Sequence, residues 1–157
     1  MIKEHESVHE MLNNYLETLA ESIKKEDIEY TSWHFSNNEE IANSLAELVK
    51  DGVKRGTTSL YYWYGLEGEE LPKEGQLSII TDWKGIAQCI IEIKKVNIMP
   101  FKEVTEEFAK IEGEGDKSLE YWRRVHIDFF TKELSEVGKE FTEDMEVVFE
   151  EFEVVYK

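Results

Sequence analysis

Lys54 and Thr57 are the two residues whose types and spacing are best suited to chemistry. They lie within residues 50 to 100, the only third of the chain in which acidic and basic side chains balance. Side chains three residues apart point to opposite faces of a regular strand but to the same side of a tight loop, and Gly52 and Gly56 permit such a loop. A lysine there can supply positive charge to a phosphate, a carboxylate or a developing oxyanion.

Two interpretations of this pair stay open on the residues alone. A buried lysine with a lowered pKa could take the proton of the Thr57 hydroxyl and activate it as a nucleophile. In the structural alternative, Thr57 only begins a strand and Lys54 is a surface residue that follows a helix.

The apolar periodicity predicts an α+β fold with helices on the outside of a set of strands. Apolar side chains recur at helical spacing over residues 5–24, and a second helix is expected from the cap candidates Asn37 and Asn38 to a stop at Gly52. Strands are expected at 57–64, 76–82, 86–98 and 147–156, and two further helices at 102–111 and 118–134. We predict a single domain over residues 1–157, with residues 1–29 as an N-terminal helical extension.

The charge of the chain limits its partners. It carries 18 basic and 35 acidic side chains and a formal net charge of −17, whereas a surface that tracks phosphates is normally basic. We therefore expect no extended DNA binding, although a local basic pocket around the three arginines (Arg55, Arg123 and Arg124) stays open. No apolar run approaches the length of about 18 residues that a membrane span needs, the N-terminus lacks the order of a signal peptide, and Cys89 has no partner for a disulfide. These features predict no membrane association and a cytoplasmic location.

Several short blocks carry a family resemblance. They are Trp33-His34-Phe35, the G-x-K-x-x-T pattern from Gly52 to Thr57, Leu71-Pro72-Lys73-Glu74-Gly75, Glu112-Gly113-Glu114-Gly115-Asp116, Tyr121-Trp122-Arg123 and Phe152-Glu153-Val154-Val155-Tyr156. Together they resemble the longer bacterial branch of the ASCH domain family, in the PUA-like superfamily, over roughly residues 30 to 157. The resemblance implies a small PUA-like β-barrel with flanking helices and, in this chain, an extra N-terminal helix.

The resemblance also implies a ligand class. Some ASCH proteins are similar to amidohydrolases that remove the acetyl group of N4-acetylcytidine, and their catalytic lysine, threonine and glutamate match Lys54, Thr57 and Glu112. In that alternative Thr57 attacks the amide carbonyl, Lys54 activates it or stabilises the oxyanion, and Glu112 shuttles the proton. The interpretation we favour is that the same three groups bind a nucleoside or an RNA element without turnover. A ribonuclease is the third alternative, which the net charge disfavours.

Further candidates for ligand binding are aromatic, basic and hydroxyl side chains close to these motifs. Exposed aromatic rings can stack on bases, and Trp33 and Trp122 are the first choices, while His126 either lines the pocket or packs in the core. The predicted ligand-binding set is Trp33, Arg55, Ser59, Trp122, Arg123 and His126.

We expect no metal and no cofactor. The H-E-x-x-H pattern from His5 to His9 has no convincing third ligand, and the acidic run Glu112 to Asp116 lacks the spacing of an EF-hand.

Overall fold

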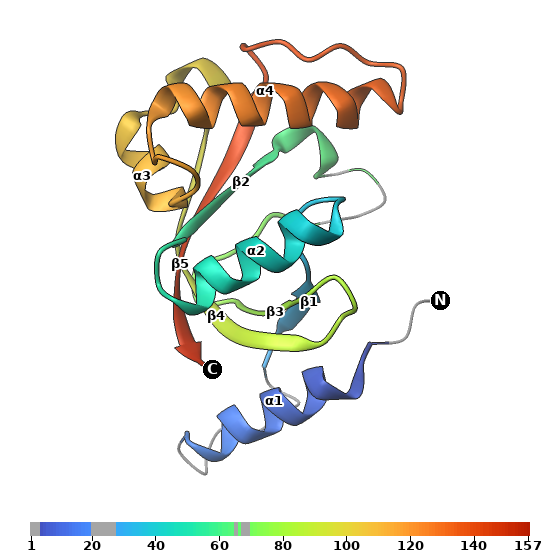
Figure 1. The fold of residues 1–157 in the computed structure, drawn as a ribbon, viewed down its shortest axis with the longest axis vertical. Helices are drawn as coiled ribbons and strands as arrows, with labels where there is room; N and C mark the ends of the chain where they lie inside the picture. The colour runs from blue at the N-terminus through green and yellow to red at the C-terminus, as the bar shows by residue number, and fades with distance from the viewer. Residues whose placement is uncertain (1–3, 20–27, 65, 67–69) are drawn as a thin grey trace.

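A computed structural model describes residues 4–19, 28–64, 66 and 70–157 as an α+β fold (Figure 1). The α-helices are α1 (Glu6–Glu17), α2 (Glu39–Lys50), α3 (Glu106–Glu112) and α4 (Leu119–Ser135). The strands are β1 (Tyr30–Trp33), β2 (Gly56–Leu60), β3 (Leu77–Thr81), β4 (Ala87–Pro100) and β5 (Glu146–Tyr156), and the 3₁₀ turns within the described residues are η2 (Tyr61–Trp63) and η3 (Phe101–Glu103). The four predicted helices and four predicted strands are all present. Residues 20–24 of the first predicted helix lie outside the described residues.

The five strands form one mixed sheet in the order β1-β3-β4-β5-β2. β1 pairs in parallel with β3, and every other pairing is antiparallel. Within the described residues no ladder joins the edge strands β1 and β2, so the expected barrel is not closed. Register shifts in β4 between Ile90 and Ile91 and between Ile93 and Lys95 mark irregularities of the kind that bend and twist a strand. The sheet is therefore open, with its two edges available to line a site.

Helices cover both faces of the sheet, which explains why all five residues of β3 are buried. Side chains alternate along a strand: Leu77 and Ile79 of β3 pack with Val8 and Leu12 of α1, whereas Ile80 packs against α2. Figure 1 shows α1 at one end of the molecule and α3 and α4 at the other. The α3–α4 end has its own core, built on the following residues: Leu60, Phe101, Val104, Ala109, Trp122, Phe130, Leu134 and Val147.

The helix ends follow their capping residues. The Asn38 side chain accepts a hydrogen bond from the Ile41 N–H and begins α2, and Ser118 caps α4 through the Tyr121 N–H. Gly52, the predicted stop, has the positive φ of 75° that a residue after a helix often adopts. None of the helices in the described ranges combines the length and apolar character required to cross a bilayer.

Candidate functional site

Lys54 is fixed by the backbone on either side of it. The N–H groups of Val53 and Lys54 both donate to the carbonyl of Leu48, at the end of α2. The Arg55 N–H donates to Ile111 of α3 (2.8 Å), and the Arg55 carbonyl accepts from the Phe152 N–H of β5 (2.9 Å). The segment is thus tied to α2, α3 and β5, and it directs the Lys54 side chain inward.

The Lys54 ammonium is buried and fully hydrogen-bonded. Its side chain is 1% exposed, which excludes the surface alternative. Nζ donates to the Gly56 carbonyl at 2.8 Å, to Glu114 Oε2 at 2.9 Å and to Glu112 Oε2 at 3.4 Å. An ammonium has three N–H donors, so each one has an acceptor.

Glu112 is the centre of this cluster. Its other oxygen, Oε1, accepts a hydrogen bond from the Thr58 hydroxyl, and His126 Nε2 lies 3.4 Å from Oε2. His126 Nδ1 is 2.8 Å from the Trp122 carbonyl, an acceptor only, so Nδ1 carries a proton. We call Lys54, Thr58, Glu112, Glu114 and His126 the buried ion cluster.

Charges within the cluster set its protonation. Burial alone would lower the pKa of Lys54, but the charges of Glu112 and Glu114 outweigh it and raise the pKa. Burial would raise the pKa of Glu112, yet Lys54 and His126 hold it well below the ordinary value. Burial, reinforced by Glu112, raises the pKa of Glu114. The pKa of His126 is raised because the Glu112 charge exceeds the opposing effect of burial. The cluster therefore favours the ammonium form of Lys54, with Glu112 as its counter-charge.

Thr57 lies between two cavities. Along β2, Gly56, Thr58 and Leu60 are buried, while the alternating Thr57 and Ser59 are partly exposed. Thr57 lines an inner cavity of about 560 Å³ between the sheet edges and an outer cavity of about 310 Å³ that also contains Lys54 and Glu112. This alternation explains why Thr58, rather than Thr57, donates to Glu112.

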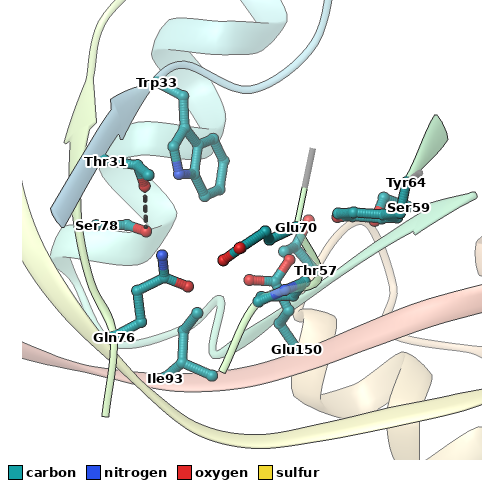
Figure 2. Close-up of a pocket in the computed structure, with 11 residues that line it drawn as sticks. Thr31, Trp33, Thr57, Ser59, Tyr64, Glu70, Gln76, Ser78, Ile93 and Glu150 are labelled. Atoms are coloured by element: carbon teal, nitrogen blue, oxygen red, sulfur yellow. Dashed lines mark hydrogen bonds between the residues drawn. The ribbon is translucent and has the colours of Figure 1, made fainter. Parts of the chain in front are cut away.

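The inner cavity is lined by side chains from all five strands, and most of them carry polar groups, with Ile93 as the contribution of β4 (Figure 2). Its described lining consists of Thr31, Trp33, Thr57, Ser59, Tyr64, Glu70, Pro72, Gln76, Ser78, Ile93 and Glu150. Some of these groups are paired with each other, because the Thr31 and Ser78 hydroxyls are 3.0 Å apart and the Ser59 and Tyr64 hydroxyls 2.8 Å apart. Glu150 is opposite Thr57 in the β2–β5 ladder, and burial raises its pKa to about 7. A cavity of this size and polarity can hold a small polar organic molecule.

The predicted site residues are distributed unevenly between these cavities. The outer cavity is lined by four of them: Lys54, Thr57, Glu112 and His126. The inner cavity is lined by Trp33 and Ser59, and it shares Thr57 with the outer cavity.

Arg55, Trp122 and Arg123 line neither cavity. Trp122 is 2% exposed and stacks between the rings of Phe101 (5.0 Å) and His126 (4.3 Å). Arg123 pairs with Glu143 at the surface. Arg55 borders a separate depression beside Lys157.

Sequence analysis missed Thr58, Glu114, Gln76 and Glu150 as site residues. Glu150 had a detectable signal, since it occupies an alternating position between the apolar Val148 and Phe152, which are both buried. A carboxylate at such a position indicates an internal polar cavity. No comparable pattern identifies Gln76 or Glu114.

Glu112, Glu114 and His126 have the ligand types of a divalent-metal site, and one ligand atom from each lies within 4.8 Å of the others. The Lys54 ammonium already contacts both carboxylates. A metal ion bound here would have to displace the Lys54 ammonium. In this structure the positive charge beside the two carboxylates comes from Lys54.

The fold and this lysine–glutamate cluster define a small α+β domain with a buried charged site beside an open mixed sheet. The family model of the ASCH domain matches residues 31–156, and the chain belongs to the ASCH domain family. The resemblance noted in the sequence motifs is thereby confirmed.

Two solved structures are similar over nearly the whole chain. One is an ASCH domain from Lactobacillus crispatus JV V101, with 40% identity, a TM-score of 0.92 and coverage of 98% of this chain and 97% of that one. The other is a DUF984-family protein from Enterococcus faecalis V583, with 35% identity, a TM-score of 0.84 and coverage of 96% and 89%. No curated protein is similar enough in sequence to count as a relative.

Proposed function

We propose that this ASCH domain binds a nucleoside, either free or as an unpaired nucleotide of an RNA element, at Thr57. The observation that carries the proposal is the position of Thr57 between the polar inner cavity and the cavity of Lys54 and Glu112. The inner cavity falls within the range of about 300 to 1,000 Å³ that is typical of small-molecule sites.

Trp33 supports a ligand with a flat ring. It is partly exposed and points into the inner cavity from β1 (Figure 2), and stacking of a base on an aromatic side chain contributes about 1 to 3 kcal/mol. The hydroxyls and amides around it are the groups that fix the orientation of a ligand in such a pocket. A nucleoside supplies both a ring to stack and hydroxyls to hydrogen-bond.

The buried ion cluster positions Thr57 rather than contacting the base. Lys54 Nζ donates to the carbonyl of Gly56, the residue immediately before Thr57, and Glu112 accepts from Thr58, the residue immediately after it. Both neighbours of Thr57 are thus held by the same charged pair. This arrangement preorganises β2, so that less ordering is needed when a ligand binds.

An amidohydrolase that deacylates N4-acetylcytidine or a related N-acyl nucleoside is the second candidate, because Thr57 shares the outer cavity with Lys54 and Glu112. Thr57 Oγ1 would attack the acyl carbon and form an ester while the C–N bond breaks. Glu112 would carry the hydroxyl proton to the leaving amine, and water would then hydrolyse the ester. Lys54, as an ammonium, could stabilise the oxyanion but could not act as the base. A ribonuclease has less support, because Lys54 is already neutralised by carboxylates.

Calorimetric titration of the full chain with each of the four ribonucleosides tests the binding proposal. Thr57→Val removes the hydroxyl at nearly constant volume and is expected to weaken binding at least tenfold, whereas Thr142→Val, at an exposed position, leaves affinity unchanged. Equal affinity of the Thr57→Val variant and the unsubstituted protein would overturn the site.

Incubation with N4-acetylcytidine separates the two candidates. Release of acetate that disappears in Thr57→Val would establish the amidohydrolase. Binding of this compound without release of acetate supports the binding module.

A further inference from the structure

Glu150 is the inner-cavity group that the proposed function leaves unused. Its carboxylate points into the cavity near Thr57 (Figure 2). Within the described part of the chain it makes no hydrogen bond or ion pair with another side chain, in contrast to Glu112, which has three polar partners. A half-buried carboxyl without partners is costly unless a ligand or a proton compensates it.

No cation lies nearby to neutralise Glu150. The described lining of the inner cavity contains no lysine, arginine or histidine, and its other titratable groups are Glu70 and Tyr64. Glu70 lies at the exposed rim beside Lys73, and Tyr64 hydrogen-bonds to Ser59. From the adjacent strands Glu150 faces Thr57 of β2 and Val96 of β4, neither of which is charged. The cavity therefore disfavours phosphate and carboxylate groups, and any phosphate of the ligand must lie outside it.

The chemistry of a carboxyl group then selects the ligand edge. A protonated carboxyl offers one O–H donor and one carbonyl acceptor side by side. Every base offers a donor beside an acceptor, but only cytosine (N3 and N4) and adenine (N1 and N6) place a basic ring nitrogen next to an exocyclic amino donor; the corresponding ring nitrogens of uracil and guanine already carry a proton. The basic ring nitrogens of cytosine and adenine can also accept the carboxyl proton. The pair then holds one proton in either of two forms: a neutral carboxyl with a neutral base, or a carboxylate with a protonated base.

We propose that Glu150 reads the base in the inner cavity by a two-hydrogen-bond pair with an amino-substituted base of the cytosine or adenine type, and that the complex holds one proton between them. The proposal rests on the proposed nucleoside function and adds the class of base. Gln76 supplies a further donor at the opposite wall: its Oε1 accepts from the Lys73 N–H, which leaves its amino group turned to the cavity (Figure 2).

The proton has a measurable consequence. Because burial raises the pKa of Glu150 to about 7, the protonated fraction falls about tenfold between pH 6 and pH 8. Cytidine and adenosine should therefore bind more weakly at pH 8. Guanosine presents two adjacent N–H donors, which suit an ionised carboxylate, so its affinity would change in the opposite direction.

Calorimetric titrations of the full chain with cytidine, adenosine, uridine and guanosine at pH 6 and pH 8 test the proposal. Cytidine and adenosine are expected to bind at least tenfold more tightly than the other two at pH 6, and to lose about tenfold at pH 8. Glu150→Gln keeps one N–H donor and one carbonyl acceptor but has no proton to share, so it should still bind nucleosides and lose both the preference and the pH dependence. Glu150→Leu should lose the preference, and Glu153→Gln, at an exposed position of the same strand, should behave like the unsubstituted protein.

Three results would overturn this inference. They are equal affinity for the four nucleosides at pH 6, a preference for guanosine at pH 6, and a Glu150→Leu variant with unchanged preference. Each of them leaves nucleoside binding itself intact. If no nucleoside binds at either pH, both this inference and the proposed function fail. Thermal unfolding of each variant verifies that it is folded before titration.

Discussion

The Lys54 ammonium is the cation at the centre of the buried ion cluster, where it contacts both Glu112 and Glu114. Burying an ammonium is costly, but two carboxylates and the Gly56 carbonyl surround it within 3.4 Å. These three acceptors offset the cost of removing the ammonium from water, and the loss of any one of them would leave part of that cost uncompensated. The cluster is best understood as a rigid support for β2.

Lys54→Met tests that support. Removing the cation leaves Glu112 buried without its counter-charge, and loss of one partner of a buried ion pair costs about 3 to 5 kcal/mol. Lys102→Met, which removes an exposed lysine paired with Asp144, is expected to cost no more than about 0.5 kcal/mol. Urea denaturation at pH 7 measures both values, and a cost below about 1 kcal/mol for Lys54→Met would contradict the supporting role.

Glu150 predicts how stability depends on pH. The folded carboxyl keeps its proton to about pH 7, whereas the unfolded one loses it near the ordinary value of 4.5. The folded state therefore binds more protons, and the protein loses stability as the pH rises from about 4.5 to 7. Glu150→Gln removes this loss, so the variant should exceed the unsubstituted protein in free energy of unfolding by up to about 3 kcal/mol at pH 8 and by little at pH 4.5.

The control for Glu150→Gln is Glu153→Gln on the same strand, whose side chain is 63% exposed. It should give the same difference in stability at every pH. If the difference in free energy of unfolding between Glu150→Gln and the unsubstituted protein is the same from pH 4.5 to pH 8, Glu150 is hydrated and ionised like a surface carboxylate.

At the scale of elements, the site depends on how closely α3 approaches the segment before β2. Gly113 ends α3 with φ 70°, and a Cβ built there would lie 2.2 Å from the Val53 carbonyl oxygen. Gly56 is similarly confined by Phe149 and Ile111, at 2.7 and 2.9 Å. These two glycines let Glu112 and Lys54 meet.

Gly113→Ala and Gly138→Ala form a matched pair, because both glycines follow a helix with φ near 70° but only Gly113 has a neighbour within 4 Å. The strain of positive φ is common to both. We expect Gly113→Ala to cost roughly 1 to 3 kcal/mol more, since backbone must move to relieve the clash. Equal losses in chemical denaturation would mean that α3 is free to shift.

The elements also show what a sequence can predict. Helical and strand periodicity located four helices and four strands, because those patterns are local. β1 was missed, since Tyr30–Trp33 is short and mixes polar with aromatic residues. The strand expected at 57–64 ends at Leu60, where the 3₁₀ turn of Tyr61–Trp63 begins. Closure of the barrel was wrong for the described strands because it depends on pairing between two edges, which no local pattern reports.

In the candidate site, too, some features could be predicted from the sequence and others depend on long-range strand pairing. The family resemblance grouped Lys54 with Glu112, and the structure places them in one ion pair. Strand register decides that Thr57 lines the inner cavity whereas Thr58 belongs to the buried ion cluster. The β2–β5 ladder places Glu150 opposite Thr57. Register is set by long-range pairing, so these positions emerge only in three dimensions.

For the whole molecule, the net charge of −17 bears on how an RNA could bind. Each neutralised phosphate contributes about 0.7 to the slope of log affinity against log salt for a single strand. Because no described cation lines the inner cavity, a short unpaired oligonucleotide rich in adenine and cytosine should show a slope of magnitude below about 1. Fluorescence titration between 50 and 300 mM salt measures it. A slope of several units would indicate backbone tracking on another surface.

The central claim is that a nucleoside occupies the inner cavity at Thr57, and amide and indole NMR signals of the labelled chain test it most directly. The four tryptophans are internal reporters: Trp33 lines the cavity, whereas Trp63 binds Glu133 and Trp83 is exposed elsewhere. Titration with adenosine or cytidine should shift the Trp33 indole and the Thr57 amide and leave Trp63 and Trp83 unchanged. An unchanged spectrum at millimolar nucleoside, or shifts confined to Trp83, would contradict the account.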